Sequence, residues 1–233
     1  MSLPVNKILF LDIDGVLNTQ SQQDKLTLDT SCINNLNSLL EDFPELKIVL
    51  TSIWRNHHAL DDIQSIFDSH GFKGKIWSVT PNLELLTTSL IFIFGNALKD
   101  QNVWGKWAST KDEFDEQFRL CTREMEISLW VNVFLACQLI TPESKMCILD
   151  DTISIWFTER SLPVSVETNP HFGSFNMERL CQVRDLFNST KNIENTFGCK
   201  LGNQIDFFDL NGLDFMPSFH FCLSEVRRIS NLI

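Results

Sequence analysis

Short, continuous apolar runs alternate along the chain with segments in which apolar residues recur every three or four positions. The continuous runs predict strands buried on both faces, at residues 7–11, 46–50, 75–80, 146–151 and 162–168. The periodic segments predict amphipathic helices, from about Asp29 to Leu40 and at residues 58–71, 122–138 and 176–187. Asp29 or Thr30 suits the N-cap of the first helix, and Gly71 suits the end of the second.

This alternation predicts an α/β fold, a parallel sheet with helices on both faces. Residues 82–120 interrupt it and are too long for an ordinary connection, so we expect an insertion or small cap there. The expected organisation is a catalytic core over residues 1–188 containing this insertion. Residues 189–233 have weak periodicity and are expected to be an accessory C-terminal segment packed on the core, or part of a partner surface.

Composition narrows the possible functions. The 233 residues carry a net charge of −11, which argues against broad nucleic-acid binding because that relies on Lys and Arg neutralising phosphates. A small basic pocket, or an acidic site neutralised by a metal ion, remains compatible with this charge. The seven cysteines form no CxxC pair and are interpreted as reduced and buried.

The apolar runs are shorter than a membrane span, and the N-terminus has no long apolar signal core. We therefore expect a cytoplasmic protein without membrane partners, although non-classical export leaves no trace in the sequence. The oligomeric state is not predicted.

Polar side chains gather where the predicted strands end: Asp12, Asp14, Thr51, Ser52, Asp150 and Asp151. The carboxyl ends of parallel strands meet at one edge of a sheet, where ligands bind. Clustered carboxylates repel one another unless a cation neutralises them, and Mg²⁺ is the simplest such cation. The pattern therefore predicts a magnesium site that acts on an anionic, phosphorylated substrate.

The stretch DIDG, residues 12–15, is informative by its context. Side chains two apart in extended chain share a face, so Asp12 and Asp14 can address one site, and Gly15 allows a sharp turn beneath a ligand. Taken alone, the stretch also fits an acidic turn or a calcium-loop fragment. It does not continue as a calcium loop, and such a loop does not follow a buried strand.

Three stretches together resemble a known family. FLDIDGVLN, IVLTSIWR and CILDD resemble three motifs of the haloacid dehalogenase (HAD) superfamily of phosphotransferases. With REMEISLW, they most resemble the HAD domain of Swiss-army-knife RNA repair proteins, over roughly residues 7–187 without the insertion at 82–120. The resemblance implies a HAD-like Rossmannoid sheet and Mg²⁺-dependent phosphatase activity.

The resemblance also implies roles for single residues. Asp12 would be the nucleophile that forms an aspartyl-phosphate, and Asp14 would protonate the leaving group and then activate water. Thr51 would hydrogen-bond the phosphoryl group, with its neighbour Ser52 as the alternative.

The implied metal site also comes from the strand ends. Asp150 would hold Mg²⁺ together with Asp12 and the backbone carbonyl of Asp14. Asp151 would be a second acid that binds the metal or orients a ligand.

A basic residue is also implied, to stabilise the phosphoryl oxygens. Arg123 fits best, with Lys106 or Lys111 as alternatives, whereas Lys145 should lie at the opposite end of its strand. Arg55 is expected either to contact substrate or to be solvated at a helix start.

Trp54, beside Arg55, is expected to pack in the core, with stacking on a nucleobase as the alternative.

The leading hypothesis is a Mg²⁺-dependent phosphomonoester hydrolase. Its substrate would be a nucleic-acid 3′-phosphate end, a nucleotide, a small phosphometabolite or a phosphoprotein. The alternatives are a catalytically silent binding module of the same fold, an interaction protein that uses the insertion and the tail, and phosphoryl transfer to an acceptor other than water. The intact pair of Asp12 and Asp14 argues against a silent module.

Overall fold

The structure is a computed structural model of the whole chain. It describes residues 4–18, 26–82, 122–153, 162–169, 174–194 and 224–229. The expected insertion lies outside the described residues from residue 83 onward, as does most of the expected C-terminal segment.

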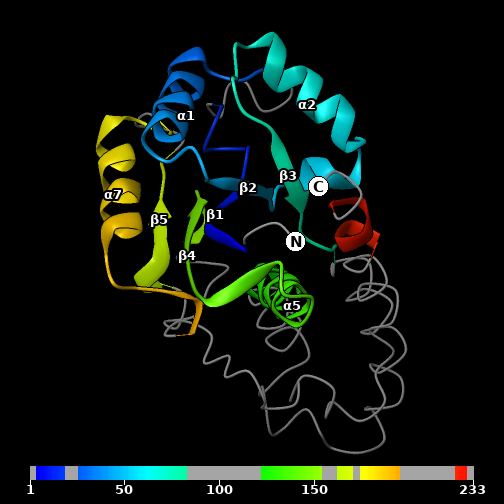
Figure 1. Cartoon of the computed structure of the whole chain (residues 1–233). Coiled ribbons are helices and arrows are strands. Elements are labelled where there is room, and N and C mark those ends of the chain that lie inside the picture. Colours follow the sequence, from blue (N-terminus) through cyan, green and yellow to red (C-terminus); the bar gives the residue numbers. More distant parts are fainter. Residues whose placement is uncertain are drawn as a thin grey trace, which may run out of the picture.

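Five parallel strands form one sheet in the order β3-β2-β1-β4-β5 (Figure 1). The strands are β1 (Val5–Leu11), β2 (Lys47–Leu50), β3 (Ile76–Val79), β4 (Ile140–Asp150) and β5 (Ser165–Glu167). All four pairs of neighbouring strands are parallel, so the five carboxyl ends lie at the same edge. The predicted fold class is confirmed.

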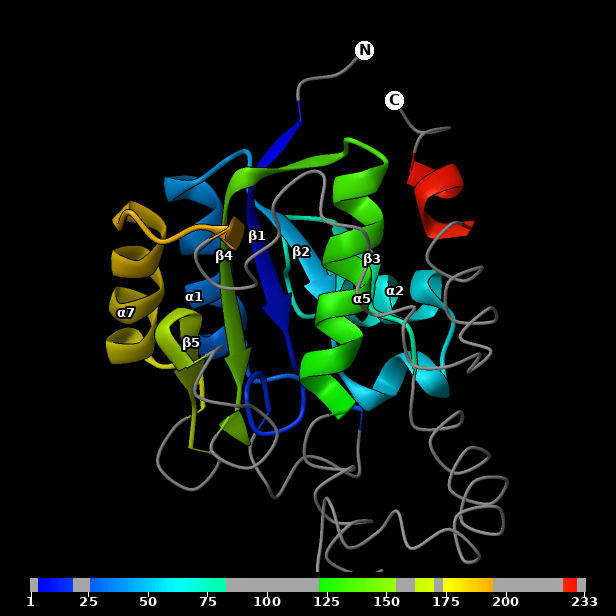
Figure 2. The same ribbon diagram turned by 90° about the horizontal axis from the view of Figure 1, so that it is seen from below.

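Helices cover both faces of this sheet. They are α1 (Thr30–Asp42), α2 (Leu60–Ser69), α5 (Thr122–Ala136) and α7 (Met177–Asn188). Buried side chains of α1, α2 and α7 share one apolar cluster with the sheet, whereas those of α5 belong to a second cluster. Figure 2 shows α5 crossing the opposite face of the sheet from α1 and α7.

The two-sided burial explains why the strands read as continuous apolar runs. In β1, Leu9 and Leu11 belong to the first cluster, while Ile8 and Phe10 belong to the second. Successive side chains of a strand point to opposite faces, and here both faces are core. Replacing any of these four residues by a polar one would bury a polar group among apolar side chains, which costs stability.

The predicted helix ends are also confirmed. Asp29 is the N-cap of α1 and its carboxylate accepts the backbone N–H of Ser31 at 2.7 Å. Gly71 follows α2 with φ of +84°, a backbone conformation that glycine adopts without steric penalty.

Two strands differ from their predicted bounds by more than two residues. β4 begins at Ile140 rather than near residue 146, because Ile140 pairs with Val5 at the start of β1. The strand expected at 162–168 is shorter: Leu162–Val164 form a 3₁₀ helix, and β5 follows it. Pro163 has no N–H to give to a strand ladder, which accounts for this late start.

Residues 224–229 of the C-terminal segment pack against β3. In residues 224–229, Arg228 donates to the carbonyl of Trp77 at 2.6 Å and Glu225 accepts from the hydroxyl of Ser78 at 3.1 Å. Ile229 is buried in the cluster that contains α5. Among the described residues, no helix has both the length and the apolar character that crossing a membrane requires.

Candidate active site

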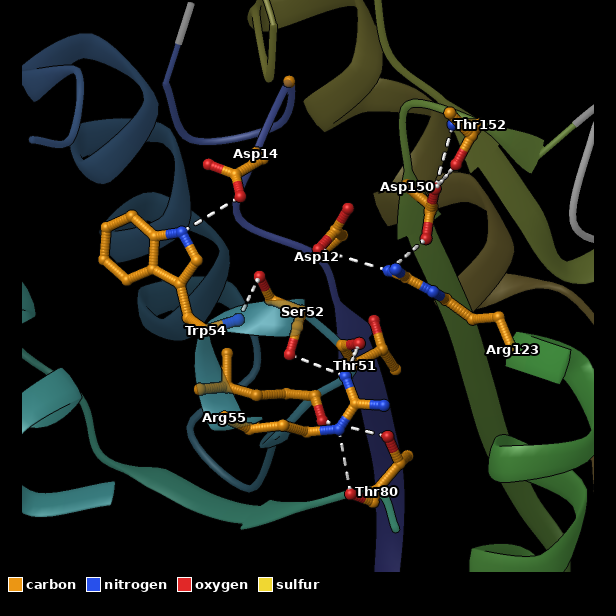
Figure 3. A network of polar contacts seen from close by, with 12 residues as sticks. Asp12, Asp14, Thr51, Ser52, Trp54, Arg55, Thr80, Arg123, Asp150 and Thr152 are labelled. Carbon is orange, nitrogen blue, oxygen red and sulfur yellow. Dashed lines mark hydrogen bonds and ion pairs between the residues drawn. The ribbon is translucent and has the colours of Figure 1, made fainter. Parts of the chain in front are cut away.

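The sheet brings the predicted site residues to one edge. Asp12 follows β1, Thr51 follows β2, and Asp150 ends β4 (Figure 3). Backbone hydrogen bonds continue the ladder past the strand ends: Asp12 donates to Leu149 at 3.0 Å, and Thr51 donates to Leu11 at 2.9 Å. The backbone at these positions is therefore fixed by the sheet itself, although the sequence separates them by up to 138 residues.

Three carboxylates form a compact acidic cluster. One oxygen from each of Asp12, Asp150 and Asp151 lies within 4.8 Å of the others. Asp12 and Asp150 are buried and Asp151 is partly buried. Burial, followed by the charge of Asp12, raises the pKa of Asp150, and burial with the charges of Asp12 and Asp150 raises the pKa of Asp151 to about 7.

This cluster fits a hard divalent cation. Its donors are all carboxylate oxygens, which Mg²⁺ and similar ions prefer. One guanidinium contacts two of the three carboxylates, so the cluster keeps an excess of negative charge for a metal ion to balance. Asp12, Asp150 and Asp151 are the residues that would hold it.

Arg123 lies beside two of these acids. It comes from the first turn of α5, and its Nη1 is 3.2 Å from Asp12 Oδ1 and 3.1 Å from Asp150 Oδ2. Burial alone would lower the pKa of Arg123, but the two carboxylates raise it above its ordinary value and keep the guanidinium charged. Arg123 is the residue that fits best in the sequence as the phosphate-stabilising cation, and it lies beside the predicted nucleophile Asp12.

Asp14 points away from the acidic cluster. Its Oδ1 accepts an N–H from Asn18 Nδ2 at 2.9 Å, and its Oδ2 accepts the indole N–H of Trp54 at 3.0 Å (Figure 3). Burial raises the pKa of Asp14 and the charge of Asp12 adds to this, while the two hydrogen bonds oppose it. The Asp14 carboxylate is therefore held by partners outside the acidic cluster, and a metal contact through its carbonyl stays a prediction.

Gly15 holds the turn beneath the cluster. Its φ is +76°, and a Cβ at this position would lie 2.0 Å from Asp151 Oδ2. Its carbonyl accepts a hydrogen bond from the hydroxyl of Thr168, after β5, at 3.0 Å. Glycine is required here for both its backbone conformation and its lack of a side chain; the predicted contact with substrate stays a prediction.

Thr51 and Ser52 differ in how their hydroxyls are used. Thr51 Oγ1 is the one buried side-chain N or O atom without a hydrogen-bond partner among the residues that the structure describes. Ser52 Oγ accepts the backbone N–H of Trp54 at 3.4 Å. The orphaned hydroxyl makes Thr51 the stronger of the two candidates for a phosphoryl contact, since buried polar groups are rarely left unpaired.

The side chain of Arg55 is buried, with 6% exposed, and is not solvated as one of the two expectations had it. Its Nε and one Nη2 donor reach the carbonyls of Thr80 and Pro81, at 3.1 and 3.3 Å. Its Nη1 donates to the carbonyls of Thr51 and Ser52, and the other Nη2 donor pairs with Glu126. A guanidinium has five N–H donors, so each is engaged within the protein.

One comparison decides the family. The family model described as the HAD domain in Swiss Army Knife RNA repair proteins matches residues 8–176. The chain belongs to this family. Comparison with curated proteins and with solved structures finds no match.

The matched range of this HAD domain runs from β1 to the start of α7 and contains every residue of the site. A HAD domain with an acidic cluster of Asp12, Asp150 and Asp151 suggests a phosphohydrolase, and the cluster is suited to a metal ion.

Trp54 packs in the core as predicted, but its contact with Asp14 and two further contacts of the site escaped the sequence analysis. Asn18 and Trp54 hold Asp14, and Glu126 pairs with Arg55. A signal existed for Glu126, because it lies three residues after Arg123 and such residues share a helix face. Nothing in the sequence pattern pairs Trp54 with Asp14, forty residues away.

Proposed function

We propose that this HAD domain is a Mg²⁺-dependent phosphomonoester hydrolase that works through an aspartyl-phosphate on Asp12. The observation that carries the proposal is the setting of Asp12. It touches the guanidinium of Arg123 at 3.2 Å and shares a 4.8 Å cluster with two further acids. A carboxylate between a fixed cation and a site suited to a metal ion is well placed to meet an anionic phosphoryl group.

In the first step, a carboxylate oxygen of Asp12 bonds to phosphorus while the bond from phosphorus to the ester oxygen breaks. Asp14 gives its proton to the departing oxygen, which leaves as an alcohol. The charge of Arg123 and the hydroxyl of Thr51 stabilise the phosphoryl oxygens. Asp12, Asp150 and Asp151 would hold a divalent ion, which would supply further charge neutralisation.

In the second step, a water molecule bonds to phosphorus and gives a proton to Asp14. The bond between phosphorus and Asp12 breaks, which releases inorganic phosphate and restores both carboxyl groups. Asp12 and Asp14 thus divide the labour, consistent with one lying in the acidic cluster and the other pointing away from it.

The family description names RNA repair proteins, which supports a phosphorylated nucleic-acid end as the substrate, and the 3′ end is the one that we propose. The net charge of −11 disfavours long duplexes, whose binding depends on many basic contacts. We therefore propose a short phosphorylated end, with nucleotides and phosphoproteins as competing substrates in the same assay.

The test is phosphate release from 4-nitrophenyl phosphate by the full chain, with Mg²⁺ and with EDTA. We expect release that requires Mg²⁺ and that Asp12→Asn abolishes. The exposed Asp61, in the first turn of α2, supplies the control variant Asp61→Asn, which should keep wild-type activity. Release that survives Asp12→Asn would refute the aspartyl-phosphate.

The substrate is then tested with one oligonucleotide carrying the phosphate at its 3′ or its 5′ end, compared with nucleoside monophosphates and a phosphopeptide. Preference for the 3′ end supports the proposed substrate. Equal rates on all of these refute it and leave the hydrolase proposal intact.

A further inference from the structure

Asp14 carries one N–H donor on each carboxylate oxygen. Asn18 Nδ2 is 2.9 Å from Oδ1 and Trp54 Nε1 is 3.0 Å from Oδ2. The plane of a carboxylate is set by a soft, roughly two-fold torsion, so two donors fix an orientation that the rotamer alone does not.

The loop that carries Asp14 is itself anchored. Asn18 accepts the backbone N–H of Gly15 through its side chain at 2.9 Å, and its carbonyl accepts the hydroxyl of Ser174 at 2.9 Å. Thr168 donates to the carbonyl of Gly15 at 3.0 Å. Asn18 is therefore part of the loop architecture, whereas Trp54 reaches Asp14 from a different element.

Trp54 is well suited to hold another side chain. It lies in the 3₁₀ helix Ile53–Asn56 after β2. It is 4% exposed, and it belongs to the first apolar cluster, the one shared by α1, α2 and α7. Its N–H is a donor only, on a rigid ring with two side-chain torsions. Core packing fixes the ring, and the ring then fixes the direction from which Oδ2 of Asp14 is held.

A buried indole N–H needs some partner, and a backbone carbonyl would serve. Here the partner is the carboxyl group that the proposed function assigns to proton transfer. We propose that Trp54 is a positioning residue that orients the Asp14 carboxyl group toward the leaving-group oxygen; this rests on the proposed function.

The effect of a misaligned proton donor depends on the leaving group. An ester with a poor leaving group needs the proton from Asp14 to depart, whereas 4-nitrophenolate departs without much help. The ratio kcat/KM reports the steps up to that departure, so it isolates the first role of Asp14 from its later role toward water. A merely structural role of Trp54 would change both esters by the same factor.

The experiment measures kcat/KM of the full chain, with Mg²⁺, for phenyl phosphate and for 4-nitrophenyl phosphate. Trp54→Phe removes the N–H and keeps an aromatic ring. We expect kcat/KM to fall about 100-fold for phenyl phosphate, the scale of a misplacement of about 1 Å. For 4-nitrophenyl phosphate we expect a fall of less than about threefold.

Trp130→Phe is the matched control. Trp130 is fully buried and its Nε1 donates to the hydroxyl of Ser78 at 3.0 Å, so it also loses one indole hydrogen bond, away from Asp14. Its effect on the two esters should be equal. If Trp54→Phe does not fold, 3-benzothienylalanine at position 54 replaces the N–H by sulfur in a ring of the same shape, and the same pattern is expected.

If kcat/KM of Trp54→Phe falls equally on the two esters, or on neither, the positioning role is overturned. The hydrolase proposal still stands in that case, because the wild-type protein turns over the esters. A wild-type protein that releases phosphate from neither ester would overturn both.

Discussion

Arg55 and Arg123 lie in the same region of the molecule and use their donors in opposite ways. Arg55 has four backbone carbonyls and Glu126 around its guanidinium, all within the protein. Arg123 instead directs Nη1 at two side chains of the acidic cluster (Figure 3). Arg55 links separate segments of the backbone, whereas Arg123 faces the carboxylates of the acidic cluster.

The two arginines are also connected. Glu126, the partner of Arg55, lies on α5 three residues after Arg123. Arg55 thereby ties the strand ends at Thr51 and Thr80 to the helix that presents Arg123. The comparison teaches that a buried arginine near a site is assigned by what its N–H groups face, since burial and charge alone describe both residues equally well.

Of the variants that test this comparison, Arg55→Met should have the largest effect, and the effect should be a loss of folding stability. The substitution removes the buried ion pair between Arg55 and Glu126, and each of the four carbonyls loses one hydrogen-bond donor. We expect the free energy of unfolding to fall by about 3–5 kcal/mol, measured by urea denaturation followed by circular dichroism.

Arg184→Met is the control for this variant. Arg184 pairs with Asp42 at the surface at 2.6 Å, and such a pair contributes less than about 1 kcal/mol. A similar small loss for both variants would contradict the comparison. If Arg55→Met does not fold, Arg55→Lys keeps the charge but not the five donors and should give a smaller loss.

Arg123→Met should act on activity instead. The acidic cluster keeps a cation when Mg²⁺ is saturating, so folding should be less affected than in Arg55→Met. The phosphoryl group loses its fixed positive charge, and we expect kcat on 4-nitrophenyl phosphate to fall about 10²- to 10³-fold. Folded Arg123→Met with wild-type kcat would show that another cation does this work.

The sequence was sufficient for the parts of the molecule that depend on local pattern. Residues 7–11 read as a buried strand because both faces of β1 are core, and the acids at strand ends converge because all the strands run parallel. The pairing of Arg55 with its partners was beyond such reasoning, although the spacing from Arg123 was a signal that Glu126 lies near the site. Glu126 is 71 residues away, and backbone carbonyls carry no sequence signal at all.

Gly15→Ala perturbs the acidic cluster that Arg123 contacts and adds no atom near Arg55. Its φ of +76° and the approach of Asp151 Oδ2 to 2.0 Å both oppose a Cβ. We expect a loss of stability of about 1–3 kcal/mol and weaker Mg²⁺ binding by calorimetric titration. Gly71→Ala is the control: its φ is +84° with no atom within 4 Å of the Cβ, so it should lose stability and keep its Mg²⁺ affinity. Equal Mg²⁺ affinity in both variants would contradict the placement of Asp151.

The smallest expected effect is on the pH dependence of Mg²⁺ affinity, which a variant of Arg123 should change and a variant of Arg55 should not. The pKa of Asp151 is raised from 3.8 to about 7, by burial first and then by Asp12 and Asp150, whereas Arg123 lowers it. Between these values the folded, metal-free chain binds a proton that the unfolded chain has released. The contribution of Asp151 to metal-free stability therefore falls as the pH rises through this window and is constant above it.

Magnesium needs the ionised carboxylate, so its affinity should rise by up to about tenfold per pH unit toward pH 7 and then level off. Calorimetric titration at a series of pH values measures this break, and Asp151→Asn should remove it. Arg123→Met should move the break to higher pH, because it removes a charge that favours ionised Asp151. Arg55→Lys should leave the break in place; if both variants moved it equally, the two arginines would act on the cluster alike and the distinction between them would fail.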